Sequence, residues 1–322
     1  MYKINSILSA VTSTGSYLPK KTVTNDDLAK TLNTSDEWIF TRTGIKTRHI
    51  SDETETTAIM AANAGKQALK KNKKIIASDI EGIIVATTTP DMTFPSVAAK
   101  VQALLNIKSA FAFDIQAICS GFLYALHVAN SLIKSGTAKN ILVIGSERMS
   151  KILNWEDRST CVLFGDGAGA VILSAQKGKI GIIDSQIKTD GTLENILYTT
   201  GGTSTTQTAG HLVMEGKEVF KHAVEKMIST SKDLLKKNNQ TASDIKWIVP
   251  HQANHRIMLA VTKKLGTSQE KLISTIDKHA NTSAASIPIA LDINNAKFKQ
   301  GDLILLIAAG AGFTWGSALI RW

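Results

Sequence analysis

The feature that most constrains the fold is a block that recurs half a chain later. In the first half, Leu69-Lys70-Lys71-Asn72 precedes Ala77-Ser78-Asp79-Ile80 and an apolar run; in the second, Leu235-Lys236-Lys237-Asn238 precedes Ala242-Ser243-Asp244-Ile245 and another. The offsets are 166 and 165 residues in a chain of 322. A repeat in the same helix-to-strand context predicts a duplicated α/β unit. We expect one half over residues 1–175 and the other over 176–322.

A second, weaker echo bears on function. The segment 113–121 (FDIQAICSG) is expected to run from a strand through a turn into a helix, and 276–283 (IDKHANTS) to do the same in the second half. Cys119 and Asn281 then occupy nearly equivalent places in the two units. If a pseudo-twofold axis relates the halves, these side chains face each other at the junction, with His251 alongside.

Short apolar runs alternate with amphipathic windows along the chain, which is the α/β pattern. Strands are predicted over 82–87, 110–115, 141–145, 161–164, 170–173, 180–183 and 247–249. Helices are predicted over 57–71, 96–105, 121–135, 215–237, 257–265 and 283–296. The uncharged stretch Leu303 to Ile320 is long enough for a membrane span, but its glycines favour two buried strands joined by a turn.

Composition excludes several function classes. The chain is 43% hydrophobic without low-complexity runs, so a disordered class is excluded, and two cysteines cannot form a disulfide scaffold. The first twenty residues lack a signal-peptide core, which favours a cytoplasmic protein. The net charge is +10, but 31 of the 37 basic residues are scattered lysines, which argues against nucleic acid. A phosphorylated small molecule or an acidic carrier protein remains compatible.

Cys119 lies where an apolar strand ends and a helix begins. A helix N-terminus stabilises a thiolate, so this position predicts a reactive cysteine with a lowered pKa. The alternative is a buried cysteine that packs as a small hydrophobic residue. Cys161, inside an apolar run, is expected to be of that second kind.

His251 follows the apolar run 247–250, at the kind of strand end where α/β folds place reactive groups. The alternative is a turn histidine bonded to the backbone. His255 has the spacing for a shared metal, but no acidic residue or cysteine pair accompanies it, so no metal is expected. Asn281 has a helix N-cap as its alternative role. The glycine-rich 165–170 (GDGAGA) is followed by a strand-like run, which favours a tight turn or a close backbone approach between strands over a dinucleotide site.

Five strings together resemble one family. They are 114–122 (DIQAICSGF), 164–170 (FGDGAGA), 249–257 (VPHQANHRI), 281–291 (NTSAASIPIAL) and 312–320 (GFTWGSALI). They look like β-ketoacyl-acyl-carrier-protein synthase III, the initiating condensing enzyme of bacterial fatty-acid synthesis, in the same order over nearly the whole chain. The resemblance implies an α/β, thiolase-like, five-layered α-β-α-β-α fold built by internal duplication.

The resemblance also implies a reaction. Cys119, His251 and Asn281 would form the catalytic triad of a decarboxylating Claisen condensation. An acyl-CoA primer, expected to be acetyl-CoA, would acylate Cys119, and malonyl-acyl carrier protein would then give 3-oxoacyl-acyl carrier protein. Backbone N–H groups of Cys119 and Ala311 would form the oxyanion hole. Acyl-CoA would be a substrate, with no cofactor. Condensation for a secondary metabolite, and a non-catalytic carrier-binding module, stay as alternatives.

The remaining implied residues bind substrates and partners. At the CoA and pantetheine end they are Trp38, Arg42, Arg158, Met214, Gly216 and Asn254. In the acyl pocket they are Phe94, which would reach across a homodimer interface, and Phe164. For the acidic carrier protein they are Gln252, Ala253, Asn254, His255, Arg256, Lys221, Lys263 and Lys264; a solvated face is the alternative for the lysines. Ala280 departs from the family, which often has glycine before the catalytic asparagine, and Ala311 interrupts the usual glycine run.

Overall fold

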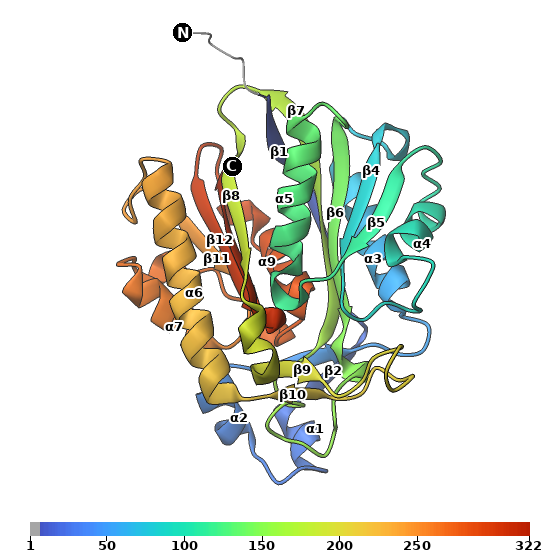
Figure 1. Cartoon of the computed structure of the whole chain (residues 1–322), viewed down its shortest axis with the longest axis vertical. Coiled ribbons are helices and arrows are strands. Elements are labelled where there is room, and N and C mark those ends of the chain that lie inside the picture. The colour runs from blue at the N-terminus through green and yellow to red at the C-terminus, as the bar shows by residue number, and fades with distance from the viewer. Residues whose placement is uncertain (1–6) are drawn as a thin grey trace.

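The computed structural model describes residues 7–322, and two β-sheets form its frame (Figure 1). The first sheet has the order β1-β7-β6-β4-β5. Its strands are β1 (Ile7–Tyr17), β4 (Gly82–Ala86), β5 (Phe111–Ile115), β6 (Asn140–Arg148) and β7 (Asp166–Lys177). Strand β4 runs parallel to β5 and β6, whereas β7 is antiparallel to β6 and β1. The carboxyl ends of β4, β5 and β6 therefore meet at one edge.

The second sheet comes from the second half of the chain, in the order β11-β12-β13-β8. Its strands are β8 (Gly181–Thr189), β11 (Trp247–Pro250), β12 (Leu303–Gly310) and β13 (Thr314–Arg321). Strands β12 and β13 pair antiparallel from Leu303 and Arg321 to Gly310 and Thr314, so the predicted C-terminal hairpin is confirmed. No helix within residues 7–322 has the length and apolar character to cross a bilayer.

Helices fill three layers around the two sheets (Figure 1). Between the sheets lie α5 (Gly121–Lys134) and α9 (Ser286–Ile293), which share one core with residues of both. Outside the first sheet lie α3 (Thr57–Lys71) and α4 (Val97–Leu104). Outside the second lie α6 (Gly216–Lys237) and α7 (His255–Lys264). The predicted five-layered α-β-α-β-α fold is confirmed, whereas the boundary near residue 175 stays a prediction.

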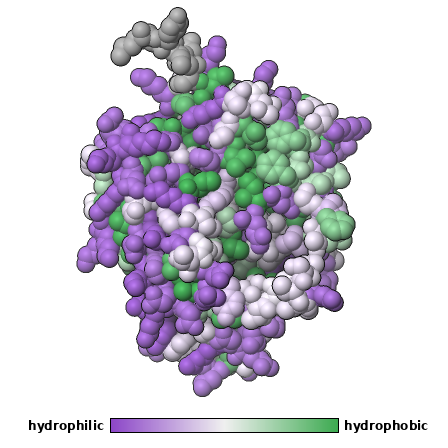
Figure 2. All heavy atoms as spheres, viewed as in Figure 1, coloured by the Kyte–Doolittle hydropathy of each residue, from purple (hydrophilic) through white to green (hydrophobic). Residues whose placement is uncertain are grey.

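Shorter elements gather at one end of the molecule (Figure 1). These are α1 (Asn25–Ala29), α2 (Asp36–Thr43), α8 (Ile276–His279), β2 (Lys21–Thr24), β3 (Thr47–Ile50), β9 (Leu197–Thr199) and β10 (Leu212–Met214). Eight 3₁₀ turns complete the described chain: η1 (Ala77–Asp79), η2 (Ile118–Ser120), η3 (Met149–Lys151), η4 (Gly191–Ile196), η5 (Gln269–Lys271), η6 (Ser283–Ala285), η7 (Asn295–Lys297) and η8 (Ala311–Phe313). In Figure 2 hydrophilic residues cover most of the visible face, and apolar residues gather in its middle, near α5.

Helix α9 and the turn η6 before it approach the first sheet closely because glycines face them. A methyl group added at Gly169 would lie 2.5 Å from the Ile289 nitrogen, and one at Gly145 would lie 2.3 Å from the Ala284 oxygen. Neither distance is possible for a real side chain, so glycine permits this packing. The glycine-rich segment 165–170 was predicted to make a tight turn or a close approach between strands. Gly169 does permit a close backbone approach, but to helix α9 and not to a strand.

Two predicted strands are wrong. Residues 161–163 form a turn, because the Asp157 carbonyl accepts the Cys161 N–H at 3.0 Å and draws the chain back. Phe164 then makes an isolated bridge with Asn281 in place of a strand. The segment before Asn281 is the short helix α8, since the Thr275 carbonyl accepts the N–H groups of Lys278 and His279 at 3.2 and 3.1 Å. Strand β1 was not predicted, because serine and threonine interrupt its apolar residues; residues 1–6 of that first stretch lie outside the described chain.

Candidate active site

Cys119 lies in η2, between the end of β5 and the start of α5. The turn before it is tight: Ile118 has φ 46°, a left-handed conformation that branched residues rarely adopt. The Ser120 hydroxyl bonds the Ala117 carbonyl at 2.8 Å and the Thr314 hydroxyl at 2.7 Å. A hydrogen bond thus connects the η2 turn, in the first half of the chain, to β13 in the second half.

The thiol is almost fully enclosed, with 5% of Cys119 exposed. Burial raises its pKa to about 12, although a hydrogen bond with the Ser283 side chain acts in the opposite direction. The expected lowered pKa is therefore wrong, because removal from water outweighs the helix N-terminus at this position. A reactive Cys119 needs a group that takes its proton.

His251 directly follows β11, and its N–H continues the sheet by donating to the Ile307 carbonyl at 2.8 Å. Its Nδ1 lies 2.7 Å from the Ser286 hydroxyl, which also accepts the Gln252 N–H at 3.2 Å. We assign the single hydroxyl proton to the bond with Nδ1, and in that tautomer the ring hydrogen lies on Nε2. Burial lowers the pKa of His251 to about 3, so the ring is neutral. It is a hydrogen-bond donor toward the cavity rather than a cation.

Asn281 is oriented by its own loop. Its Oδ1 accepts the Ser283 N–H at 2.8 Å, and its Nδ2 is 3.5 Å from the Ala253 carbonyl. The carboxamide therefore presents N–H to the cavity. Ala280, the departure from the family pattern, has φ 56°, so this position keeps a glycine-type backbone despite its methyl group.

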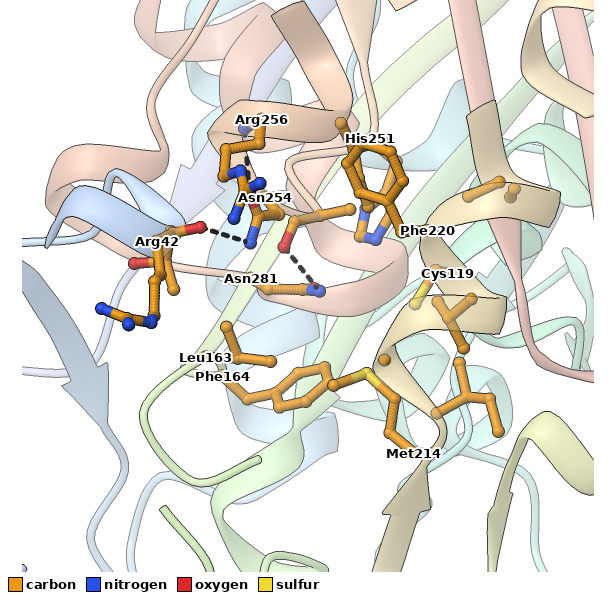
Figure 3. Close-up of a pocket in the computed structure, with 18 of the residues that line it drawn as sticks. Arg42, Cys119, Leu163, Phe164, Met214, Phe220, His251, Asn254, Arg256 and Asn281 are labelled. Carbon is orange, nitrogen blue, oxygen red and sulfur yellow. Dashed lines mark hydrogen bonds between the residues drawn. The ribbon is translucent and has the colours of Figure 1, made fainter. Parts of the chain in front are cut away.

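One cavity of about 500 Å³ collects these groups (Figure 3). Cys119, His251 and Asn281 all line it, and Figure 3 shows them directed toward the same space. The structure therefore brings together the three residues predicted to act as one site. Among residues 7–322, no cluster of three or more histidine, cysteine or acidic side chains has a geometry that could hold a metal ion.

The far end of the cavity carries the predicted CoA residues. Trp38 lies under two guanidinium groups, with Arg42 at 4.5 Å and Arg158 at 4.8 Å from its ring centre. The Asn254 amide donates to the Arg42 carbonyl at 3.1 Å, which joins α2 to the start of α7. The predicted residues that line this cavity are Trp38, Arg42, Phe164, Met214, Gly216, Ala253, Asn254 and Arg256.

Other predicted residues lie elsewhere. Ala311 lines a smaller cavity of about 100 Å³, which also includes Cys119 and shares Phe164 with the first cavity. Phe94 is 81% exposed and lines neither cavity within its own chain. Gln252 is corrected: it is 1% exposed, and its side chain bonds the Pro250 carbonyl and the Thr275 N–H, so it cannot meet a partner. Among the other predicted docking residues, four are exposed and three are half-buried. The exposed ones are Lys221, Arg256, Lys263 and Lys264, and the half-buried ones are Ala253, Asn254 and His255.

Three polar residues next to the triad were not predicted. Ser283 and Ser286 lie within the string 281–291, but nothing in that string marks them as partners of Asn281 and His251. Glu147 is fully buried beside the nucleophile loop. The available signal was a charged residue two positions after the apolar run 141–145, at a strand carboxyl end.

Comparison with known proteins agrees with this geometry. Two family models match, 3-oxoacyl-[acyl-carrier-protein] synthase III over residues 113–191 and its C-terminal part over 235–322. The β-ketoacyl-[acyl-carrier-protein] synthase III of Wolbachia pipientis wMel is 56% identical over 317 residues, covering 98% of this chain and 99% of that protein. The chain belongs to the β-ketoacyl-acyl-carrier-protein synthase III family. Its members are acyltransferase-type condensing enzymes of fatty-acid synthesis.

Solved structures extend the similarity. The 3-oxoacyl-[acyl-carrier-protein] synthase III of Aquifex aeolicus VF5 superposes with a TM-score of 0.93 at 48% identity, over 98% of this chain and 100% of that one. The priming β-ketosynthase of the R1128 polyketide pathway gives 0.92 at 31% identity, over 99% and 98%. The synthase III family and the thiolase-type fold thus hold over nearly the full chain, and the family's initiating condensation is the activity of this enzyme class.

Proposed function

We propose that this enzyme condenses an acyl-CoA primer, acetyl-CoA in the simplest case, with malonyl-acyl carrier protein through an acyl-Cys119 intermediate. The observation that carries the proposal is the single cavity that joins Cys119 to two oriented N–H donors, His251 and Asn281. Its products are 3-oxoacyl-acyl carrier protein, carbon dioxide and free CoA. The reaction uses no resident cofactor.

In the first half-reaction, the Cys119 sulfur attacks the thioester carbonyl and CoA leaves as its thiol. The oxyanion formed accepts hydrogen bonds from the backbone N–H groups of Cys119 and Ala311. Support comes from the close approach of the two loops, since a methyl group added at Gly310 would lie 2.8 Å from the Cys119 nitrogen. Trp38 and its two arginines suit the nucleotide end of CoA, where an adenine can stack and phosphates meet positive charge.

In the second half-reaction, the malonyl carboxylate leaves as carbon dioxide and its electron pair becomes an enolate. His251 Nε2–H and Asn281 Nδ2–H stabilise the enolate oxygen, and both stay donors because neither group is ionised at neutral pH. The carbanion attacks the acyl carbonyl on Cys119, and the sulfur departs as thiolate. Donors held in place before the reaction lower its barrier without reorganisation.

The partners follow from the surface around this cavity. Arg256 borders the entrance and Lys263 and Lys264 end the same helix, which offers positive charge to an acidic carrier protein. A homodimer is supported by β5, an edge strand whose residues are all half-buried, and by the exposed Phe94. Both cysteines are unpaired, which suits the reducing cytoplasm.

The test is the intact mass of the enzyme after incubation with acetyl-CoA. We expect one acetyl adduct on the wild type, located on the Cys119 peptide, and none on Cys119→Ala. Cys161→Ala is the matched control, because Cys161 is also a buried thiol but lines neither cavity, and it should acetylate like the wild type. An unmodified wild type, or an adduct that survives Cys119→Ala, would contradict the proposal.

A second candidate is priming of a secondary-metabolite pathway, which the similarity to the R1128 priming β-ketosynthase favours. It shares the acyl-enzyme and differs in the acceptor and the primer. Acetylated enzyme offered malonyl groups on the fatty-acid carrier protein should yield acetoacetyl product at once. Turnover only with another carrier protein would favour the second candidate.

A further inference from the structure

Glu147 is the one acidic side chain in the described chain that is both fully buried and bonded to η6, the turn that follows Asn281. It ends the buried part of β6, with 0% exposed, and no salt bridge involves it among residues 7–322. Its neighbours are hydroxyl and amide donors. Thr89 Oγ1 donates at 2.6 Å, Thr87 Oγ1 at 3.3 Å and the Thr88 N–H at 3.1 Å.

A further contact of this carboxylate leads to the active site. Ser283 Oγ donates to Glu147 Oε1 at 3.2 Å. Ser283 belongs to η6, which packs against the η2 turn of Cys119, and its hydroxyl lowers the pKa of the Cys119 thiol. The Ser283 N–H meanwhile holds the Asn281 carboxamide at 2.8 Å. One serine thus connects the buried carboxylate with the nucleophile and with an oriented donor.

We propose that Glu147 is a positioning residue for the nucleophile, which holds the Ser283 hydroxyl and, through it, takes up the proton that Cys119 releases. In this step the thiol proton passes to Ser283 Oγ while the serine proton passes to Glu147 Oε1. A thiol and a carboxylate become a thiolate and a carboxylic acid, so the buried charge stays at −1. After attack on the thioester the proton returns along the same chain to the departing CoA sulfur. This step rests on the acyl-Cys119 route proposed above.

Electrostatic effects in both directions bear on that assignment. The Glu147 charge raises the pKa of Cys119, whereas the proposed transfer moves this charge to the sulfur and adds no second one. Burial raises the pKa of Glu147 to about 7, against the effect of its hydrogen bonds. His251, the other candidate acceptor, is a poor base because burial lowers its pKa to about 3. The groups that face Glu147 are the hydroxyls and amide after β4, Ser283 of η6 and the Cys119 thiol of η2; the thiol is the titratable one among these.

The test measures thiol reactivity without any substrate. Iodoacetamide alkylates the enzyme between pH 5 and 9, and peptide mass mapping reports the rate at Cys119. The wild-type rate should rise through an inflection near pH 7, where Glu147 becomes a carboxylate able to accept the proton. In Glu147→Gln the inflection should vanish and the rate at pH 7.5 fall about tenfold or more, since each unit of pKa is tenfold in thiolate.

Asp166→Asn is the matched control. Asp166 is equally buried and accepts four hydrogen bonds from Ser51 and Ser150, yet it lines none of the cavities that reach Cys119. It should lose a similar amount of stability and keep the wild-type pH profile. Ser283→Ala keeps the carboxylate and removes only the connecting hydroxyl, so it should lose the inflection as well, and it replaces Glu147→Gln if that variant does not fold.

Unchanged or faster alkylation of Glu147→Gln would overturn the proposal. Faster alkylation would mean that the Glu147 carboxylate only repels the Cys119 thiolate, so that its removal makes the thiol easier to ionise. The proposal also fails if Ser283→Ala keeps the inflection. The acetylation test of the wild type is independent of these rates. If the wild type were not acetylated, the proposed function would fail, but the pH dependence of alkylation at Cys119 would still test the role of Glu147.

Discussion

Replacing Gly310 with alanine tests whether the two halves of the chain meet at the nucleophile. The added methyl carbon would lie 2.8 Å from the Cys119 nitrogen and 3.0 Å from its Cβ, closer than packed atoms tolerate. Because β12 is buried along its whole length and cannot move freely, the η2 loop has to shift. Overpacking of this kind costs about 1 to 3 kcal/mol of stability.

We expect Gly310→Ala to unfold earlier in urea by that amount and to lose most of its acetylation by acetyl-CoA. The loss would follow from displacement of the Cys119 N–H, the proposed oxyanion donor. Gly191→Ala is the matched control, since an added methyl group there meets nothing within 4 Å and the residue has no left-handed φ. A Gly310→Ala protein with wild-type stability and wild-type acetylation would refute the reasoning.

Four further outcomes are expected. Ser286→Ala frees the His251 ring from its assigned tautomer and should lower the decarboxylation rate about tenfold or more while Cys119 still acetylates, read from carbon dioxide release and intact mass. Trp38→Ala should raise KM for acetyl-CoA with kcat nearly unchanged, because the ring contacts Arg42, which Figure 3 shows across the cavity from Cys119; equal losses in both would contradict this. Ala280→Gly relieves a φ of 56° and should stabilise the fold by about 1 kcal/mol in urea unfolding. Burial raises the pKa of Glu147 from 4.5 to about 7, so the folded state holds this proton more tightly than the unfolded state and stability falls as pH rises between those values. Relative to Glu147→Gln, the wild type should lose about 3 kcal/mol of unfolding free energy between pH 4.5 and 7, and parallel pH curves would contradict it.

The sequence predicted correctly those elements whose ends are set by neighbouring residues, such as helix caps and glycines in a turn. Helix α3 begins and ends where expected, because Thr56 caps its first turn and Lys70 and Lys71 occupy its last. The C-terminal hairpin was predicted from glycines that interrupt an uncharged run. The strand predicted over 161–164 failed, since the Asp157 carbonyl captures a backbone N–H that a strand would have offered to a neighbour.

The site was predictable as far as the duplication reaches. Cys119 and Asn281 each precede a central helix, α5 and α9, so their convergence followed from the repeat. The Glu147 contacts did not follow, because their partners lie 60 and 136 residues away in the chain, at Thr87 and Ser283. The raised pKa of Cys119 was missed for a related reason: burial is a property of the assembled cavity, whereas a helix start can be read locally.

The most direct test of the shared site is a single-turnover experiment on enzyme already acetylated at Cys119. Malonyl-acyl carrier protein is added, and the mass of the carrier protein reports whether acetoacetyl product forms. The wild type should convert within one turnover, whereas His251→Ala and Asn281→Ala should keep the acetyl group on Cys119 and release little carbon dioxide. Wild-type conversion by both variants would contradict a single cavity in which one sulfur and two N–H donors work on the same substrates.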